Sequence, residues 1–183
     1  MRLYRQTVED FGLYTGMCLD EDQLKKLRNA AGQMSAKMRA VRIVSASSIS
    51  KKELERRLVQ KGEDPKQAHE AVQWMSDLDL VDDAKTAEQI VHSCIRKGYG
   101  LARAKQALYE KRIPKEFWEE ALDDYPEQED KILEFLRSRL TADADAKQVK
   151  RAVDALLRRG HRYGQIKKAL NQLSLDADEF SED

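Results

Sequence analysis

A repeated segment constrains this chain more strongly than any single motif. Ile95–Leu108 and Leu157–Leu170 lie 62 positions apart and are identical at five of fourteen positions, including an arginine and, two residues later, a glycine, with a basic residue between them in both copies. Leu108–Leu122 resembles the earlier segment Leu58–Val72, with one residue of shift. Repeated units of this size bury their hydrophobic faces against their neighbours, so the pattern predicts a stack of similar helical units.

Hydrophobic spacing predicts that these units are helical. Apolar residues between Ala87 and Ile95 recur at the intervals of one helix face, and Gly98 follows as a helix end. Helix starts are indicated at Asp20 with Gln23, at Ser50, and at Asp64 with Pro65. Only the first 19 residues lack this spacing, and they fit a small strand pair or a poorly ordered arm. The sequence therefore predicts an all-α protein, with an interruption expected at Gly32.

The domain organisation expected from these patterns is a series of three-helix repeats. An extension of open structure covers residues 1–35, the repeats cover 36–80, 81–126 and 127–175, and an acidic tail covers 176–183. Charged residues make up 36% of the chain, and the mean hydropathy is −0.73. Such a polar composition favours an elongated array with a large surface over a compact sphere, so an elongated, curved monomer is expected.

Charge alternates along the chain in step with the repeat, although the net charge is zero. Ala36–Gly62 carries eight basic and two acidic residues, and Glu63–Ile90 carries two basic and eight acidic residues. Val91–Lys115 has seven basic residues against one acidic, and Glu116–Glu134 has one against nine. This alternation favours a surface that binds a charged partner over a randomly solvated one.

The basic groups are the candidate binding residues. Basic side chains near a helix C-terminus also stabilise the helix dipole, but one charge per end would serve that purpose. The surplus favours an anionic partner, either nucleic acid or an acidic protein face. The candidates are Arg56, Arg57, Lys61, Arg96, Lys97, Arg103, Lys105, Arg158, Arg159, Arg162, Lys167 and Lys168.

The sequence lacks the usual signatures of catalysis, cofactors and metals. It contains no glycine-rich phosphate loop, nucleophile elbow or H-E-x-x-H motif. His92 and Cys94 are two apart on a helix and therefore point in different directions. Acidic residues at Asp82-Asp83, and at Asp143 and Asp145, are expected to cap helices. We predict a non-enzymatic protein without cofactor or metal.

The sequence also predicts the cellular location of the protein and three side chains of its core. Cys94 lies on an apolar helix stripe, which indicates a buried thiol in a reducing compartment. No apolar run reaches the length of a membrane span, so a cytoplasmic protein without membrane contact is expected. Trp74 and Trp118 are predicted to belong to the core.

Several short motifs, in order, resemble one bacterial family. The chain is similar to the RecX family, the regulators of the RecA recombinase, over Ala36–Leu173. Departures are Ser47-Ser48 before the capping serine, Arg112 in place of a glycine, and Thr86 in place of an aromatic residue. The motifs are Ser50-Lys51-Lys52-Glu53-Leu54, Lys61-Gly62, Leu80-Val81-Asp82-Asp83, Lys97-Gly98-Tyr99-Gly100 with Arg103, Lys111 with Ile113, and Arg158-Arg159-Gly160 with Tyr163 and Ile166.

This resemblance implies a fold and a function. It implies tandem three-helix repeats in a curved array that lies in the groove of the RecA–DNA filament and suppresses ATP hydrolysis, strand exchange and co-protease activity. It supplies no catalytic residues. Single-stranded or double-stranded DNA is a further expected partner. Two alternatives remain open at this point: a general helical-repeat nucleic-acid-binding protein, and a protein–protein scaffold.

Overall fold

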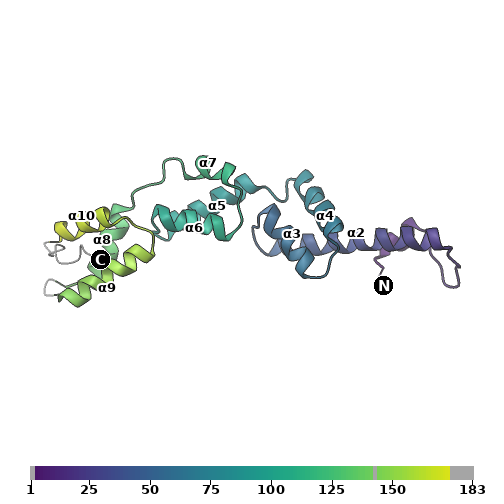
Figure 1. Ribbon diagram of the computed structural model, residues 1–183, viewed down its shortest axis with the longest axis horizontal. Coiled ribbons are helices and arrows are strands. Elements are labelled where there is room, and N and C mark those ends of the chain that lie inside the picture. The colour runs from purple at the N-terminus through teal and green to yellow at the C-terminus, as the bar shows by residue number, and fades with distance from the viewer. Residues whose placement is uncertain (1–2, 142–143, 174–183) are drawn as a thin grey trace. The chain divides into compact units, whose positions relative to one another are not determined.

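The computed structural model describes residues 3–141 and 144–173, and every regular element within them is a helix (Figure 1). The all-α prediction is confirmed. The chain divides into two compact units, Met1–Thr86 and Ala87–Asp183. The predicted acidic tail and Asp143 lie outside the described residues.

The first unit is built on one long helix. Its helices are α1 (Arg5–Asp10), α2 (Glu21–Ala46), α3 (Lys51–Gln60) and α4 (Pro65–Asp77). Helices α3 and α4 pack on the second half of α2, and Leu54, Leu58 and Met75 are fully buried between them. Complete burial of side chains of this size contributes about 1.5–3 kcal/mol each to folding.

Two expectations for the start of the chain were wrong. The segment before Asp20 contains the short helix α1, which contacts α2, rather than a strand pair or an arm. Helix α2 also runs through Gly32 without a break. The glycine leaves room for the amide end of the Gln67 side chain on α4, which a Cβ atom at this position would displace.

Local capping explains where the helices of the first unit begin and end. Asp20 and Gln23 form the predicted capping box at α2. The Asp64 carboxylate accepts hydrogen bonds from the first turn of α4, which Pro65 opens. Gly62 ends the preceding turn with φ of +89°, a conformation that glycine adopts without strain.

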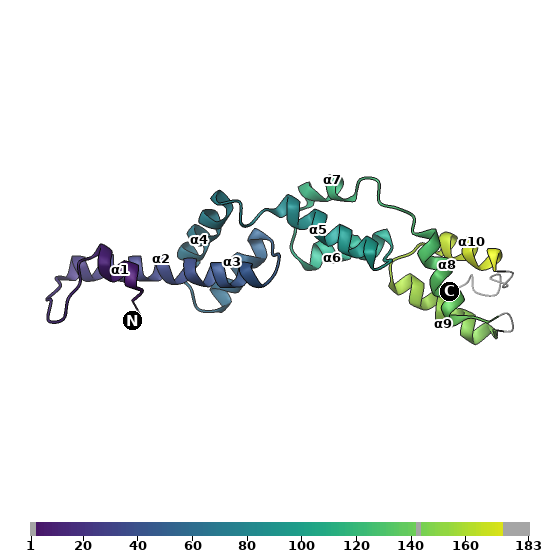
Figure 2. The ribbon, with the colours of Figure 1, turned by 180° about the vertical axis from the view of Figure 1, so that it is seen from behind.

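The second unit contains two further helix groups. Its elements are α5 (Asp83–Arg96, whose first turn precedes the boundary), α6 (Leu101–Glu110), the 3₁₀ turn η1 (Lys115–Phe117), α7 (Trp118–Leu122), α8 (Glu129–Arg139), α9 (Ala146–Arg158) and α10 (Tyr163–Gln172). One hydrophobic core joins α5, α6 and α7, and a second joins α8, α9 and α10. Helices α5 and α6 lie side by side in both views (Figures 1 and 2).

Some side chains at the edges of these cores differ from expectation. Leu157 has the apolar character of a core residue but is 42% exposed, because it lies in the last turn of α9. Trp74 and Trp118 are half-buried rather than central. Trp118 donates its indole N–H to the carbonyl of Ile113 at 3.0 Å, as a tryptophan at a core edge requires. Cys94 is buried as predicted, and burial raises the pKa of its thiol.

Candidate nucleic-acid interface

Two arginines of the first predicted basic group share one carboxylate of their own helix. Arg56 and Arg57 both bind the carboxylate of Glu53, at 2.6 Å and 3.0 Å. The hydrogen bond from Arg56, followed by that from Arg57, lowers the pKa of Glu53 to about 2, although partial burial opposes the shift. Lys61 is exposed at the end of α3. These arginines therefore stabilise α3, and Glu53 compensates one of their two positive charges.

The second predicted basic group is mostly exposed. Arg96 and Lys97 are exposed at the end of α5, and Lys105 is exposed on α6. Arg103 is the exception, since its Nη1 lies 3.0 Å from Oε1 of Glu110 on the same helix. Three of the four cations in this group are therefore open to a partner.

The third predicted basic group lies at the end of α9 and on α10. Lys168 pairs with Glu129 of α8 at 2.6 Å, and Lys167 is half-buried. Arg158 and Arg162 are exposed, and Arg159 is half-buried. The three arginines of this group therefore differ in exposure.

One hollow of about 330 Å³ collects arginines from three helices of the second unit. We call it the arginine hollow. It lies beside the start of α6 and the ends of α8 and α9. Three of the predicted basic residues line it: Arg103 of α6, and Arg158 and Arg159 at the end of α9. Its lining residues are Tyr99, Arg103, Phe135, Arg139, Ala155, Arg158 and Arg159.

Phe135 of α8 holds two of these guanidinium groups. The guanidinium carbon of Arg159 lies 4.7 Å from the centre of the Phe135 ring, and that of Arg139 lies 5.4 Å from it. Both distances fall within the range of a cation–π contact, which is worth about 0.5–1 kcal/mol at an exposed site. The ring therefore orients the two positive charges without neutralising them.

No carboxylate among the described residues forms an ion pair with Arg139, Arg158 or Arg159. Arg103 is the only arginine of the hollow that has such a partner within the described ranges. The hollow therefore concentrates positive charge that the described part of the chain leaves uncompensated, to a greater extent than the pair on α3.

The hollow depends on a close backbone junction between the two cores of the second unit. The amide of Gly100 donates to the carbonyl of Arg159 at 2.9 Å, and the amide of Ala102 donates to that of Gly160 at 3.3 Å. A Cβ atom on Gly100 would overlap the backbone of Gly160, and one on Gly160 would overlap the amide of Arg103. Gly160 also has φ of +87°. The repeated glycine is thus a point of contact as well as a helix end.

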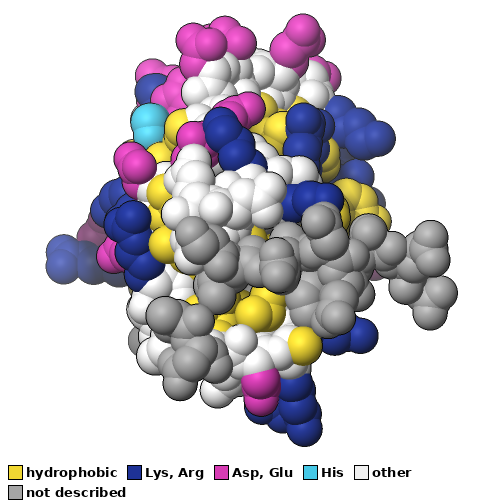
Figure 3. All heavy atoms as spheres, turned by 90° about the vertical axis from the view of Figure 1, so that its left-hand side faces the viewer, with side chains coloured by type: hydrophobic (Ala, Val, Ile, Leu, Met, Phe, Trp, Pro, Cys, Tyr) yellow, Lys and Arg dark blue, Asp and Glu magenta, His cyan; other side chains and the backbone are white. Residues whose placement is uncertain are grey.

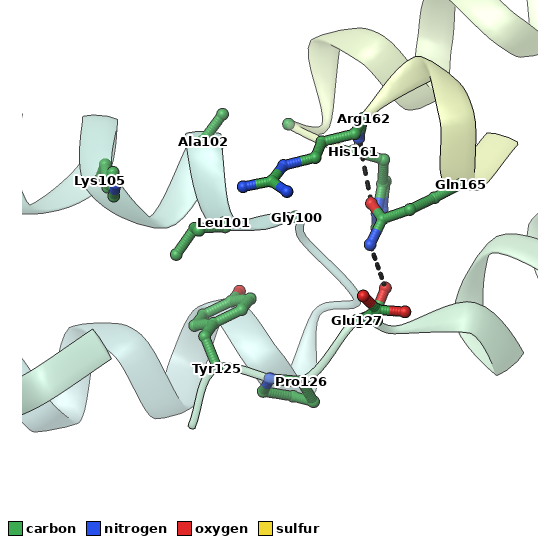
Figure 4. Close-up of a pocket in the computed structure, with 11 residues that line it drawn as sticks. Gly100, Leu101, Ala102, Lys105, Tyr125, Pro126, Glu127, His161, Arg162 and Gln165 are labelled. Carbon is green, nitrogen blue, oxygen red and sulfur yellow. Dashed lines mark hydrogen bonds between the residues drawn. The ribbon is translucent and has the colours of Figure 1, made fainter. Parts of the chain in front are cut away.

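A second hollow, of about 280 Å³, also borders this junction (Figure 4). Arg162 extends over Gly100 and Leu101, and Tyr125 lies below them (Figure 4). Gln165 accepts from the amide of Arg162 at 3.1 Å and donates to the carbonyl of Glu127 at 3.4 Å (Figure 4). These contacts tie the start of α10 to the segment that leads into α8.

The half-buried Tyr125 and the buried His161 reinforce the junction. The Tyr125 hydroxyl donates to the carbonyl of Tyr99 at 2.7 Å, and burial raises the pKa of Tyr125 to about 12. Nε2 of His161 lies 3.0 Å from the carbonyl oxygen of Gly98, so this nitrogen carries the proton. Burial, despite that hydrogen bond, lowers the pKa of His161, with a smaller contribution from Arg159. The imidazole is therefore held neutral.

The remaining acidic residues have structural roles. Asp82 accepts from the amide of Lys85 at 3.1 Å at the start of α5, and this backbone hydrogen bond lowers the pKa of Asp82. Asp83 is buried and accepts from the amide of Lys51 at 2.9 Å. Asp145 caps α9 with Gln148 as its partner. The predicted capping roles of Asp82 and Asp145 are confirmed.

Charge is unevenly spread over the end of the molecule drawn in Figure 3. Acidic side chains gather mainly toward the top of that view, whereas basic side chains lie at both sides (Figure 3). Within the described ranges, no three His, Cys, Asp or Glu side chains come together as metal ligands. Nor does any helix in that part of the chain have the length and apolar character needed to cross a membrane.

Comparison with known proteins agrees with the motifs in the sequence. Residues 82–122 match the family model of the second three-helix domain of RecX. The Regulatory protein RecX of Clostridioides difficile (strain 630) is 27% identical over 188 residues, covering 97% of this chain and 86% of the relative. The resemblance to the RecX family is confirmed.

Solved RecX structures share the fold. A crystal structure of regulatory protein RecX superimposes with a TM-score of 0.72 at 18% identity, covering 92% of this chain and 88% of the other. RecX from Lactobacillus salivarius gives a TM-score of 0.66 at 24% identity, covering 79% of this chain and 98% of the other. At these identities the likeness establishes the helical fold alone.

Four lining residues of the arginine hollow were not predicted from the sequence as binding residues: Tyr99, Phe135, Arg139 and Ala155, of which Ala155 adds neither charge nor ring. Arg139 ends α8 as a basic residue ends other helices, which is a usable signal. Phe135 gave no signal, because an aromatic residue at helical spacing usually belongs to a core, and Tyr99 appeared only as part of a family motif. The predicted members of the hollow are Arg103, Arg158 and Arg159, so the sequence found half of the residues that matter there.

Proposed function

We propose that this chain is a non-enzymatic regulator that binds the RecA–DNA filament and inhibits RecA. The observation that carries the proposal is the arginine hollow, in which Arg139, Arg158 and Arg159 have no carboxylate partner among the described residues. Uncompensated guanidinium groups on a rigid helical scaffold suit an anionic or mixed-charge partner. The relatives named Regulatory protein RecX support a regulatory role, and the RecX resemblance supplies RecA as the partner.

The mechanism follows from several weak contacts made by one chain. Basic groups recur on successive helix groups, so one molecule, acting as a monomer, contacts more than one protomer of a filament. Tethering raises the effective concentration of each further contact once the first has formed. A filament whose protomers are bridged in this way cannot cycle nucleotide freely, and its ATPase, strand exchange and co-protease activities fall together. The acidic segments set the register of binding rather than its strength.

The test is a titration of RecA ATPase on single-stranded DNA with this protein. We expect inhibition at ratios well below one chain per RecA protomer. The charge reversal Arg158→Glu is expected to weaken inhibition by about tenfold or more, since it places an acidic group where a cation meets the partner. Arg137→Glu is the matched control, because Arg137 is exposed on α8 and does not line the hollow.

Two results would contradict the proposal. One is the absence of inhibition at a stoichiometric amount of the chain. The other is equal inhibition of an unrelated ATPase that depends on single-stranded DNA, which indicates that the protein only sequesters DNA. The second result favours the general nucleic-acid-binding protein over a RecA regulator.

A further inference from the structure

We propose that the arginine hollow is a binding site for the phosphodiester backbone of nucleic acid, formed where Tyr99 and Arg103 of one core meet Arg139, Arg158 and Arg159 of the next. The proposal deepens and rests on the proposed function, because DNA is one component of the filament. It concerns direct contact between this chain and nucleic acid at a defined place, and it does not require RecA to be present.

The arginine hollow has an excess of positive charge. Four guanidinium groups line one hollow, and only Arg103 has a carboxylate partner among the described residues. Cations gathered in this way repel one another, and a bound anion removes that repulsion. By contrast, Arg56 and Arg57 share the carboxylate of Glu53, which leaves one of their two charges uncompensated. The hollow therefore favours an anionic ligand over a neutral one.

The side chains that line the hollow are mainly hydrogen-bond donors. Each arginine offers only N–H donors, and the only side-chain acceptor that lines the hollow is the hydroxyl of Tyr99. A phosphodiester backbone offers acceptors and no donors, so it matches this lining. A peptide segment brings one N–H donor with nearly every residue, and most of these donors find no acceptor here. The lining therefore favours nucleic acid over an acidic peptide.

Two of the arginines are held in place before any ligand binds. Phe135 holds the guanidinium groups of Arg139 and Arg159 against its ring, which reduces the side-chain freedom that binding removes. A planar guanidinium presents paired donors that fit two phosphate oxygens at once. None of the lining residues is a lysine. This composition fits recognition of phosphate groups without recognition of base sequence.

Binding at this site is coupled to the junction between the two cores. The lining comes from Tyr99 and Arg103 on one side, and from α8 and α9 on the other. The same two sides are joined by the backbone hydrogen bond from Gly100 to Arg159. A phosphodiester that contacts both sides stabilises the closed junction by mass action. Binding is therefore expected to raise the melting temperature of the protein.

The test measures binding of fluorescein-labelled oligothymidylate to the full chain by anisotropy at several salt concentrations, without RecA. The variant Arg139→Ala/Arg158→Ala is expected to bind about tenfold or more weakly, since a hydrogen bond from a charged group contributes strongly to affinity. Its log–log salt slope is expected to fall by about 0.7 for each phosphate that is no longer neutralised on a single strand. Arg139→Lys/Arg158→Lys, which retains charge, is expected to bind more tightly than the alanine variant.

Arg137→Ala is the matched control, because it removes an exposed arginine from the same helix end without touching the hollow. Its affinity and salt slope are expected to stay close to those of the original protein. Equal weakening in Arg137→Ala and in the double variant would show diffuse charge rather than a site, and would overturn the proposal.

Further binding experiments compare single-stranded DNA with duplex DNA and with an acidic polypeptide. A duplex of the same length tests whether paired strands present the backbone equally well, and binding of either form supports the site. Polyglutamate that displaces the oligonucleotide as effectively as unlabelled oligothymidylate would overturn the preference for phosphodiester. Loss of DNA binding in the double variant, with RecA inhibition intact, would support the site while showing that the filament is recognised through protein.

Discussion

Helices α3 and α9 each carry two adjacent arginines and are each followed by a basic residue and a glycine, but the arginines of α3 lie in mid-helix and those of α9 directly before the glycine. On α3, Arg56 and Arg57 bind Glu53, and a Cβ atom on Gly62 would meet nothing within 4 Å. On α9, Arg158 and Arg159 bind no carboxylate of the described residues, and Gly160 packs against the backbone at the start of α6. The same motif closes a helix in the first unit and builds a junction and a charged hollow in the second.

The difference shows that a count of basic residues does not measure the charge available to a partner. A carboxylate three or four residues away on the same helix faces the arginine and neutralises it. Helix α9 has Asp154 in the same relation to Arg158, but the two form no ion pair. Its arginines instead line the hollow, and Arg159 lies over the ring of Phe135.

The largest expected effect concerns the two glycines. Gly160→Ala is expected to lower the free energy of unfolding by about 3 kcal/mol or more, because left-handed strain adds to overlap with the backbone of Arg103. Gly62→Ala has the same strain and open space, so about 1–2 kcal/mol is expected. Urea denaturation of both variants measures the difference. Equal destabilisation would mean that the junction gives way easily and would remove the contrast.

A smaller effect is expected from Glu53, the carboxylate that pairs with the arginines of α3. Glu53→Gln is expected to lower the free energy of unfolding by about 2 kcal/mol near pH 7, because it leaves Arg56 and Arg57 without their partner. The pKa of Glu53 is about 2 in the fold against 4.5 for the free side chain. Its stabilising contribution is therefore complete above about pH 4.5 and is lost as the pH falls toward about 2.

Denaturation curves at pH 7 and pH 3 for the original chain and for Glu53→Gln test this contribution. The two proteins are expected to differ more at pH 7 than at pH 3. A difference that stays constant with pH would indicate that the glutamate acts through packing rather than through charge.

The smallest effect concerns the residue after each glycine. Glu63 follows Gly62 and is buried with Arg39 as its ion partner, whereas His161 follows Gly160 and is buried in its neutral form. Burial lowers the pKa of His161. The unfolded chain then binds the proton more readily, and stability falls as the pH drops below about 6.5, the pKa of a free histidine.

Melting temperatures between pH 7.5 and pH 5.5 measure this effect, with His161→Gln as the comparison. Glutamine retains a donor for the carbonyl of Gly98 but does not titrate, so its melting temperature is expected to change less over the range. His69 and His92 are exposed and remain in both proteins. An identical pH dependence in the two proteins would assign the effect to other groups.

The sequence by itself determined the helical class, most helix boundaries and the candidate basic residues. These depend on local physics: apolar spacing, capping side chains such as Asp20 and Asp64, and glycines with positive φ act within a few residues. The spacing of three and four residues also places Glu53 on one helix face with Arg56 and Arg57, although Asp154 and Arg158 form no ion pair with each other at the same spacing.

Only the tertiary structure decided which glycines are contacts and which arginines are uncompensated. Gly100 meets Gly160, and Tyr99 lines the same hollow as Arg159, because two cores distant in sequence pack against each other. Helical spacing fixes the face on which a side chain lies but not the residue that it meets from another helix. The aromatic ring of Phe135 beneath two arginines is the clearest case, because hydrophobic spacing alone assigns such a ring to a core.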